Sequence, residues 1–248
     1  MPSKIRLYFS KELKANLLSN LSNEQSHYIK NVMRLKIGEN FNIFNEHDGE
    51  WSVELSEFNK KISKVKILEE IGIKDEPSDV WILFAPVKKL RVDFIAQKVT
   101  ELGAKLIWPV ITERTQYKNI KKSKILSNTI EAAEQCGLTF IPKVNEVENL
   151  SDIIDNWNKV NSDRTLIFCD EESCNNPKNQ FEALKKTNKS NKWAILVGPE
   201  GGFSDEERKK INEVNNLSII SLGPRILRSD TAIVSSLSLF HSTIGDWV

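Results

Sequence analysis

Apolar and polar residues alternate in short runs over roughly the first seventy residues, a pattern typical of β-strands. Strands are predicted at residues 5–9, 40–44, 51–55 and 64–68. A turn sequence at 47–50, which contains Asp48-Gly49, lies between the second and third strands and indicates a hairpin. One helix is expected over residues 22–33, with Ser22 as its N-cap. Together these elements predict a small, mostly antiparallel β-barrel.

The pattern changes after a polar segment that contains a proline, Lys74-Asp-Glu-Pro-Ser78. We therefore place a domain boundary here, which divides the chain into residues 1–73 and 74–248. Strands and helices alternate in the second part. The predicted strands are 80–84, 106–110, 165–169, 193–197 and 217–222, and the predicted helices are 89–102, 124–135, 149–157, 204–214 and 231–243. The strands are continuously apolar, as buried parallel strands are, so this part is expected to be an open α/β sheet with helices on both faces.

Composition excludes several classes of protein. Apolar residues make up 40% of the 248 residues and charged residues 28%, a balance that excludes a disordered chain. No apolar run reaches the roughly 18 residues that a membrane span needs, and residues 1–10 do not resemble a signal peptide. The three cysteines are an odd number in a large chain, so we expect no disulfide scaffold and a reducing, cytoplasmic location. The three histidines are scattered, so no metal site is expected.

Charge is balanced overall but uneven along the chain. The net charge of +1 does not have the strongly basic character of many nucleic-acid-binding domains. Residues 1–36, however, hold seven basic and two acidic side chains, and residues 114–124 hold five basic side chains and no acidic one. Such patches can bind phosphates. A solvated surface is the more common explanation for one basic run taken alone.

Candidate chemistry follows three of the predicted strands, at the sheet edge where open α/β proteins bind ligands. These loops are Asp170–Ser173, Gly198-Pro-Glu-Gly-Gly202 and Gly223–Thr231. The glycine spacing of the second is not that of a common phosphate-binding loop, and it could be only a tight turn. In the third, Ser229 or Asp230 could cap the last helix. Capping does not explain its two arginines, because the dipole at a helix N-terminus disfavours cations.

At these residues the chain resembles a known family. Leu196-Val-Gly-Pro-Glu-Gly-Gly202 and Leu222-Gly-Pro-Arg-Ile-Leu-Arg-Ser-Asp-Thr-Ala232 resemble the signature pair of the RsmE family, the small-subunit ribosomal RNA uridine-N3 methyltransferases of the SPOUT superfamily. Further matches are Arg6 in Ile-Arg-Leu-Tyr-Phe, Val-Met-Arg34, Gln97-Lys98, Glu101-Leu-Gly103, Thr112-Glu-Arg114 and Ala132–Gly137. Ser229-Asp230 stands where the family usually has Thr-Glu.

The resemblance implies an N-terminal PUA-like RNA-binding β-barrel and a C-terminal SPOUT-type α/β domain with a trefoil knot. It also implies a homodimer that acts on small-subunit (16S) ribosomal RNA, which we expect to be assembled in the 30S subunit. S-adenosyl-L-methionine is the implied cofactor, and neither a metal nor a membrane is involved. The implied cofactor contacts are Leu196, Gly198, Pro199, Gly201, Leu222, Gly223, Ile226, Leu227, Thr231 and Ala232.

The same resemblance suggests roles for charged residues. Arg228 is expected to stabilise the uracil anion, and either Glu200 or Asp230 to accept the proton from N3. The expected contacts to the RNA backbone are Arg6, Lys30, Arg34, Lys36, Arg114, Lys118, Lys121 and Lys122. Two alternatives stay open, a ribose 2′-O-methyltransferase of the same superfamily and a non-catalytic RNA-binding protein of ribosome assembly. The glycine loop and Arg228 favour an enzyme.

Overall fold

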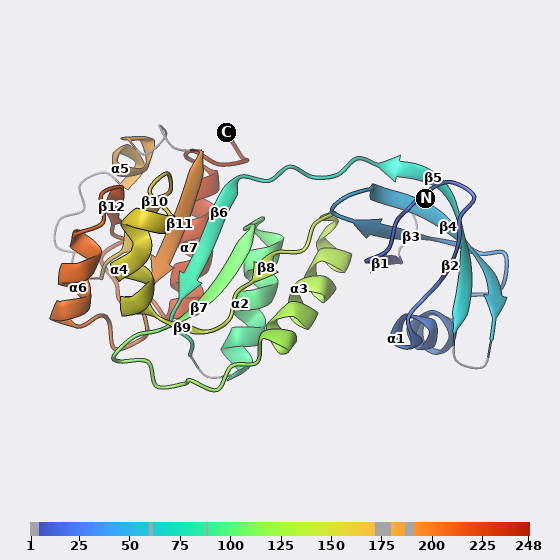
Figure 1. Cartoon of the computed structure of the whole chain (residues 1–248), viewed down its shortest axis with the longest axis horizontal. Coiled ribbons are helices and arrows are strands. Elements are labelled where there is room, and N and C mark those ends of the chain that lie inside the picture. The colour runs from blue at the N-terminus through green and yellow to red at the C-terminus, as the bar shows by residue number, and fades with distance from the viewer. Residues whose placement is uncertain (1–4, 60–61, 88, 172–179, 187–190) are drawn as a thin grey trace. The chain divides into compact units, whose positions relative to one another are not determined.

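The structure, a computed structural model, describes residues 5–59, 62–87, 89–171, 180–186 and 191–248. It divides into two units (Figure 1). The first consists of Met1–Glu76 and Ala133–Ile141, and the second of Pro77–Ala132 and Pro142–Val248. The sequence predicted a division after residue 73 but gave no sign that residues 133–141 belong with the N-terminal unit.

The first unit contains a five-stranded sheet with the order β1-β3-β4-β5-β2. Its strands are β1 (Arg6–Tyr8), β2 (Leu18–Asn20), β3 (Asn40–Asn45), β4 (Gly49–Phe58) and β5 (Ser63–Gly72). β1 pairs with β3 in parallel, and the other three pairings are antiparallel. Gly49 begins β4 with a φ of +77°, which confirms the tight turn between β3 and β4.

The predicted helix over 22–33 consists of two pieces. It begins as α1 (Asn23–His27), where Ser22 and Gln25 form a capping box. It continues as a π-helical segment, Tyr28–Val32. Ile29 of this segment is fully buried and packs with Phe41, Ile43 and the other apolar residues of the sheet. The expected cap is confirmed, and the change of helix type was not predicted.

The second unit contains a parallel sheet with the order β12-β10-β11-β6-β7-β8. Its strands are β6 (Asp79–Phe84), β7 (Leu106–Ile111), β8 (Lys143–Val144), β9 (Glu148–Asn149), β10 (Thr165–Cys169), β11 (Lys192–Val197) and β12 (Leu217–Ile220). β9 pairs with the end of β7. The five predicted strands and the parallel α/β sheet are confirmed.

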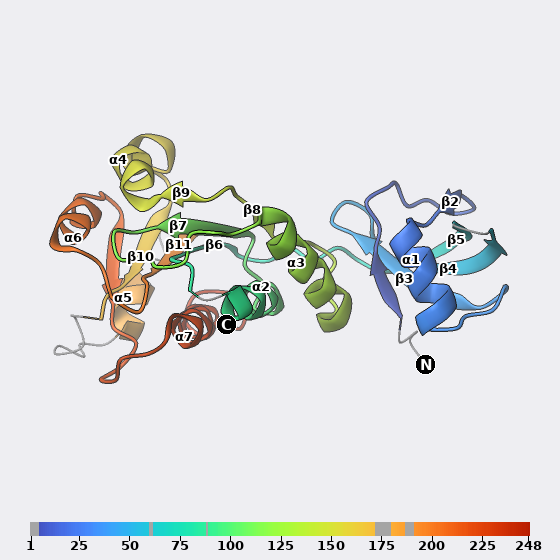
Figure 2. The same ribbon diagram turned by 90° about the horizontal axis from the view of Figure 1, so that it is seen from below.

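Helices cover both faces of this sheet (Figure 2). They are α2 (Lys89–Glu101), α3 (Lys122–Cys136), α4 (Leu150–Val160), α5 (Gln180–Lys186), α6 (Asp205–Asn212) and α7 (Ser229–His241). Alternate residues of β6 point to opposite faces. Val80 and Ile82 join the core with α2 and α7, and Leu83 joins the core with α4 and α6. In the described part of the chain, every helix is too short or too polar to cross a bilayer.

The last helix returns from the edge of the sheet to its centre. β12 is the edge strand, but α7 packs against β6, β11 and α2. The connection between them, residues 221–228, lines the same pocket as the loop that follows β11. This path brings two loops that are distant in sequence to one place.

Candidate functional site

A pocket lies at the carboxyl ends of three neighbouring strands, β10, β11 and β12. It is lined by Cys169, Asp170, Glu171, Val197, Gly198, Pro199, Glu200, Gly201, Gly202, Leu222, Gly223, Arg225, Ile226, Leu227, Ser229 and Ala232. Described residues of all three loops that the sequence singled out therefore meet, as expected for an open α/β sheet. In the first of these loops, Glu172 and Ser173 lie outside the described residues.

The glycine loop after β11 has a backbone path that larger residues would disturb. The Gly202 amide donates to the carbonyl of Pro199 at 3.0 Å, which closes a turn, and Gly202 has a φ of +68°. A Cβ added at Gly198 would lie 2.5 Å from Cε2 of Phe203. Phe203 is fully buried, so it has little room to move away. Packing thus requires glycine at position 198, and the left-handed backbone favours it at 202.

A side chain at the start of α7 joins the two signature loops. The hydroxyl of Ser229 donates to the carbonyl of Gly198 at 2.9 Å. The N-cap position is Arg228, which makes no side-chain capping hydrogen bond. Asp230 accepts from the amide of Thr231 at 2.8 Å. The prediction that Ser229 or Asp230 is the N-cap is therefore wrong, because Arg228 holds that position and the Ser229 hydroxyl connects the two loops.

Two carboxylates stand on the pocket wall after β10, and an arginine of α6 holds them. Arg208 forms an ion pair with Asp170, and its Nη2 donates to Oε1 of Glu171 at 2.6 Å. The Arg208 and Asp170 side chains are only 11% and 12% exposed. No signal in the sequence distinguished Arg208 from its charged neighbours on α6.

The loop after β7 also contacts the glycine loop. Arg114 Nη1 donates to the carbonyl of Gly201 at 2.9 Å, and the amide of Glu113 donates to Oε1 of Glu207 at 2.9 Å. Glu207 is buried and also forms a capping box with Ser204 at the start of α6. Arg114, which the resemblance suggested as an RNA contact, therefore also supports the backbone of the glycine loop.

The remaining wall is largely apolar. Leu222, Leu227 and Ala232 line it, together with Cys169 at the end of β10. Burial raises the pKa of the Cys169 thiol to about 12, so this side chain is neutral at physiological pH. The pocket thus offers a ligand an apolar surface together with three carboxylates, Asp170, Glu171 and Glu200, and the guanidinium of Arg225.

Nine of the residues suggested for cofactor binding or catalysis line this pocket. They are Gly198, Pro199, Glu200, Gly201, Leu222, Gly223, Ile226, Leu227 and Ala232. Four others are their chain neighbours but do not form the wall: Leu196, Arg228, Asp230 and Thr231. The Leu196 side chain is fully buried in the core with α4 and α6, while Arg228 and Thr231 are exposed.

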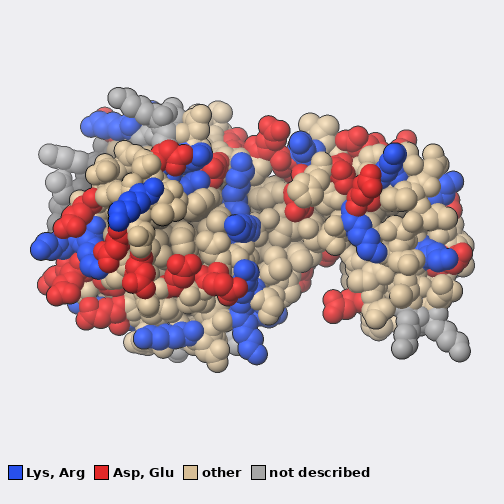
Figure 3. All heavy atoms as spheres, in the orientation of Figure 1, with Lys and Arg blue, Asp and Glu red and all other residues tan. Residues whose placement is uncertain are grey.

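Most of the suggested RNA contacts are exposed lysines and arginines. Lys30, Arg34 and Lys36 lie on the first unit, and Lys118, Lys121 and Lys122 on the second. Lys122 also pairs with Glu146, at 3.1 Å. Both signs of charge are spread over the face seen in Figure 3, in agreement with the net charge of +1.

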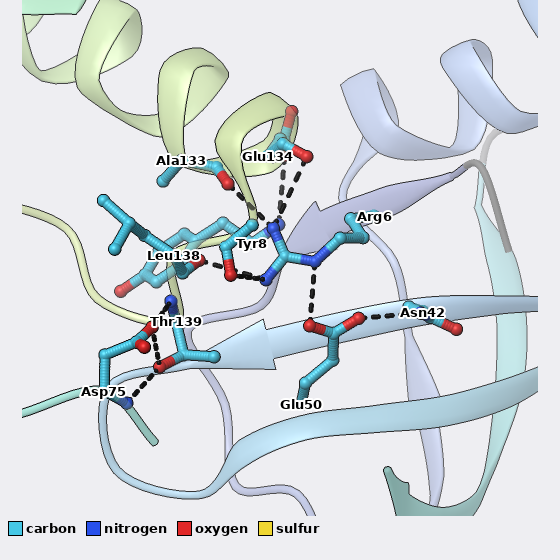
Figure 4. Close-up of polar contacts among 10 residues, drawn as sticks. Arg6, Tyr8, Asn42, Glu50, Asp75, Ala133, Glu134, Leu138 and Thr139 are labelled. Carbon is cyan, nitrogen blue, oxygen red and sulfur yellow. Dashed lines mark hydrogen bonds and ion pairs between the residues drawn. The ribbon is translucent and has the colours of Figure 1, made fainter. Parts of the chain in front are cut away.

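Arg6 is placed differently from this expectation (Figure 4). Its side chain is 12% exposed, and its Nε donates to Glu50 Oε2 at 2.8 Å. Its other nitrogens donate to the carbonyls of Ala133, Gly137 and Leu138 at 2.8, 3.1 and 3.0 Å. These carbonyls lie at the C-terminal end of α3, where the helix dipole favours a cation. Arg6 thus joins β1 to the segment after α3 inside the first unit.

Comparisons with known proteins match both units. Residues 74–241 match a family described as an RNA methyltransferase domain, and residues 21–68 match an RNA methyltransferase PUA domain. The chain is 31% identical to ribosomal RNA small subunit methyltransferase E of Buchnera aphidicola (subspecies Acyrthosiphon pisum), over 98% of this chain and 94% of that protein. It is 26% identical to the enzyme of the same name from Rickettsia conorii, over 94% and 93%.

Two solved structures share the fold over nearly their whole length. A Legionella pneumophila methyltransferase, solved with bound cofactor SAM, is 31% identical with a TM-score of 0.82 and covers 98% of both chains. Ribosomal RNA small subunit methyltransferase E of Neisseria gonorrhoeae, bound to S-adenosyl methionine, is 25% identical with a TM-score of 0.83. That similarity covers 98% of this chain and 99% of the other.

Proposed function

Because the chain belongs to the ribosomal RNA small subunit methyltransferase E family, we propose that it methylates a uridine of small-subunit ribosomal RNA at N3, with S-adenosylmethionine as methyl donor. The observation that carries this proposal is the pocket that the two signature loops form together. The Ser229–Gly198 hydrogen bond joins these loops at the carboxyl edge of the sheet, where open α/β proteins bind ligands.

The residues of the pocket fit this cofactor. The apolar part of the wall, with Cys169, Leu222 and Leu227, suits an adenine ring. Glycines at 198 and 201 let polar groups of a ligand approach the backbone closely. Asp170 and Glu171 supply negative charge for a ligand that carries a positive one. When bound, S-adenosylmethionine supplies a methyl group on a positively charged sulfur.

The chemistry required of the protein is to make uracil N3 nucleophilic. The N3–H bond must break and its proton must pass to a base. The nitrogen would then form its bond to the methyl carbon as the bond from that carbon to sulfur breaks, and the sulfur would keep the electron pair. Glu200 and Asp230 are the two candidate bases, and Glu200 is the one that lines the pocket. Arg228 is exposed and directly follows the lining residue Leu227, so it can stabilise the uracil anion by a charge-assisted hydrogen bond.

The RNA would contact both units. The PUA match and the exposed Lys30, Arg34 and Lys36 support a phosphate-binding surface on the first unit. Lys118 and Lys121 support a second one, near the start of α3. Phosphate contacts give affinity that falls with salt but little choice of sequence, so the target uridine must be selected through RNA shape and an extruded base. We further propose that the chain acts as a homodimer, which sedimentation analysis can test.

The deciding experiment uses small ribosomal subunits that lack the modification. They are incubated with the protein and S-adenosylmethionine labelled in its methyl group, and the RNA is then digested to nucleosides for mass analysis. We expect labelled 3-methyluridine. A ribose-methylated nucleoside would instead identify a 2′-O-methyltransferase, and cofactor binding without any transfer would indicate a non-catalytic protein. The variant Arg228→Ala should bind the cofactor but lose transfer.

A further inference from the structure

The first turn of α6 holds two of the loops around the pocket. Glu207 accepts from the amide of Glu113 in the loop after β7. The next residue, Arg208, binds both carboxylates of the loop after β10. The capping box between Ser204 and Glu207 fixes this turn directly after the glycine loop.

The pocket lining and burial point to a role for Arg208 beyond stability. Asp170 and Glu171 line the pocket, and Arg208 contacts both of them but is not itself part of the wall. Glu171 also contacts the glycine loop, because a Cβ added at Gly202 would clash with its Oε1. The charged residues of the lining are Asp170, Glu171, Glu200 and Arg225, so the wall carries three negative charges and one positive charge, and Arg208 behind it adds a second positive charge.

We propose that Arg208 is a positioning residue that holds Asp170 and Glu171 at the pocket wall, where their charge makes the pocket prefer the cationic cofactor over its neutral thioether product. This inference rests on the proposed function. Methyl transfer turns the sulfonium of S-adenosylmethionine into the uncharged sulfur of S-adenosylhomocysteine. A wall with net negative charge therefore binds the donor better than the product and favours product release.

The test compares the affinities of the purified full-length protein for S-adenosylmethionine and S-adenosylhomocysteine by calorimetry. The quantity measured is the preference, the dissociation constant of the product divided by that of the donor. Glu171→Gln removes one negative charge and leaves the Arg208–Asp170 ion pair in place. We expect the preference to fall about threefold to tenfold, the range for one partly screened charge a few ångströms away.

Arg208→Gln separates positioning from simple charge balance. If Arg208 acts by holding the carboxylates, this variant also loses preference, and the double variant with Glu171→Gln loses no more than Arg208→Gln alone. If Arg208 only neutralises charge, its removal raises the preference, and the proposal is overturned. Lys210→Gln is the matched control, since Lys210 lies on the same helix and pairs with Asp155 at 2.7 Å, a partner that does not line the pocket.

Other outcomes also decide the matter. A preference within twofold of wild type in Glu171→Gln overturns the inference, and so do independent effects of the two substitutions. Because Glu171→Gln keeps the more buried ion pair, it serves as the test even where Arg208→Gln does not fold. A wild-type protein that binds neither compound would refute the proposed function itself. A wild-type protein that binds S-adenosylmethionine and S-adenosylhomocysteine equally well would refute only the inference about Arg208.

Discussion

Replacing Gly198 by alanine should damage both the fold and the pocket. The added Cβ would lie 2.5, 2.9 and 3.1 Å from three carbons of the Phe203 ring. That ring is 1% exposed and packs edge-on against Phe168, with ring centroids 5.0 Å apart, so it cannot turn away without disturbing the core. Overpacking of this kind costs about 1–3 kcal/mol. For a chain of this size, we expect a melting temperature lower by about 2–12 °C.

The substitution should also displace the glycine loop and weaken its contact with α7, because the Gly198 carbonyl accepts the hydrogen bond from Ser229. We therefore expect affinity for S-adenosylmethionine to fall at least tenfold, measured by calorimetry on protein that circular dichroism shows to be folded. Gly201→Ala is the matched control for the melting temperature only, since its Cβ would meet Arg114 Cβ at 3.4 Å, an ordinary contact. A Gly198→Ala protein with wild-type melting temperature and affinity would refute this packing argument.

Three further predictions concern other contacts. Ser229→Ala should weaken cofactor binding and cost about 1–2 kcal/mol of unfolding free energy, measured by urea titration, because it leaves the Gly198 carbonyl without this donor. Arg6→Met should cost about 2–4 kcal/mol in the same assay, since Glu50 loses its buried ion pair. Burial lowers the pKa of His241 below its usual 6.5, so the unfolded chain takes up a proton more readily than the folded chain. The contribution of His241 to the free energy of unfolding should therefore be complete above about pH 6.5 and be lost as the pH falls.

Exposed residues provide controls for these measurements. Arg34→Met removes an arginine from the surface of the first unit and should change the unfolding free energy by less than about 0.5 kcal/mol. His47→Gln is a second control of this kind, because the His47 side chain is 80% exposed, and it should also change the unfolding free energy by less than about 0.5 kcal/mol. If His241→Gln leaves the pH dependence of the unfolding free energy between about pH 5 and 8 unchanged, burial of the His241 imidazole is not its cause.

Most helices of the second unit could be predicted because their apolar residues recur on one face, and its longer strands because they are continuously apolar. The elements that were missed lack such a pattern. β2 is a short strand with mostly exposed residues, and β8 and β9 have two residues each. The π-helical turn at 28–32 shares its apolar face with an ordinary helix, so periodicity cannot distinguish the two.

The place of the pocket was also predictable, since it depends on which loops follow buried parallel strands. The functions of the arginines were not. Arg6 bonds to carbonyls 127 to 132 residues away, Arg208 to carboxylates 37 and 38 residues away, and Arg114 to a carbonyl 87 residues away. A local pattern carries no information about such partners. The basic segments 1–36 and 114–124 therefore suggested RNA contacts. In the folded chain, Arg6 and Arg114 bind backbone carbonyls instead.

The hydrogen bonds of Arg6 to residues 133–138 affect when the N-terminal unit can fold during translation. The N-terminal unit takes its last segment, Ala133–Ile141, from beyond residue 76, and Asp75 accepts from the Thr139 amide at 2.7 Å. At about 5–20 residues per second, the ribosome needs roughly 3–13 seconds to add the 65 residues between positions 76 and 141. Throughout that interval the guanidinium of Arg6 has no helix end to bind. The N-terminal unit therefore cannot complete its fold until residues 133–141 have been synthesised.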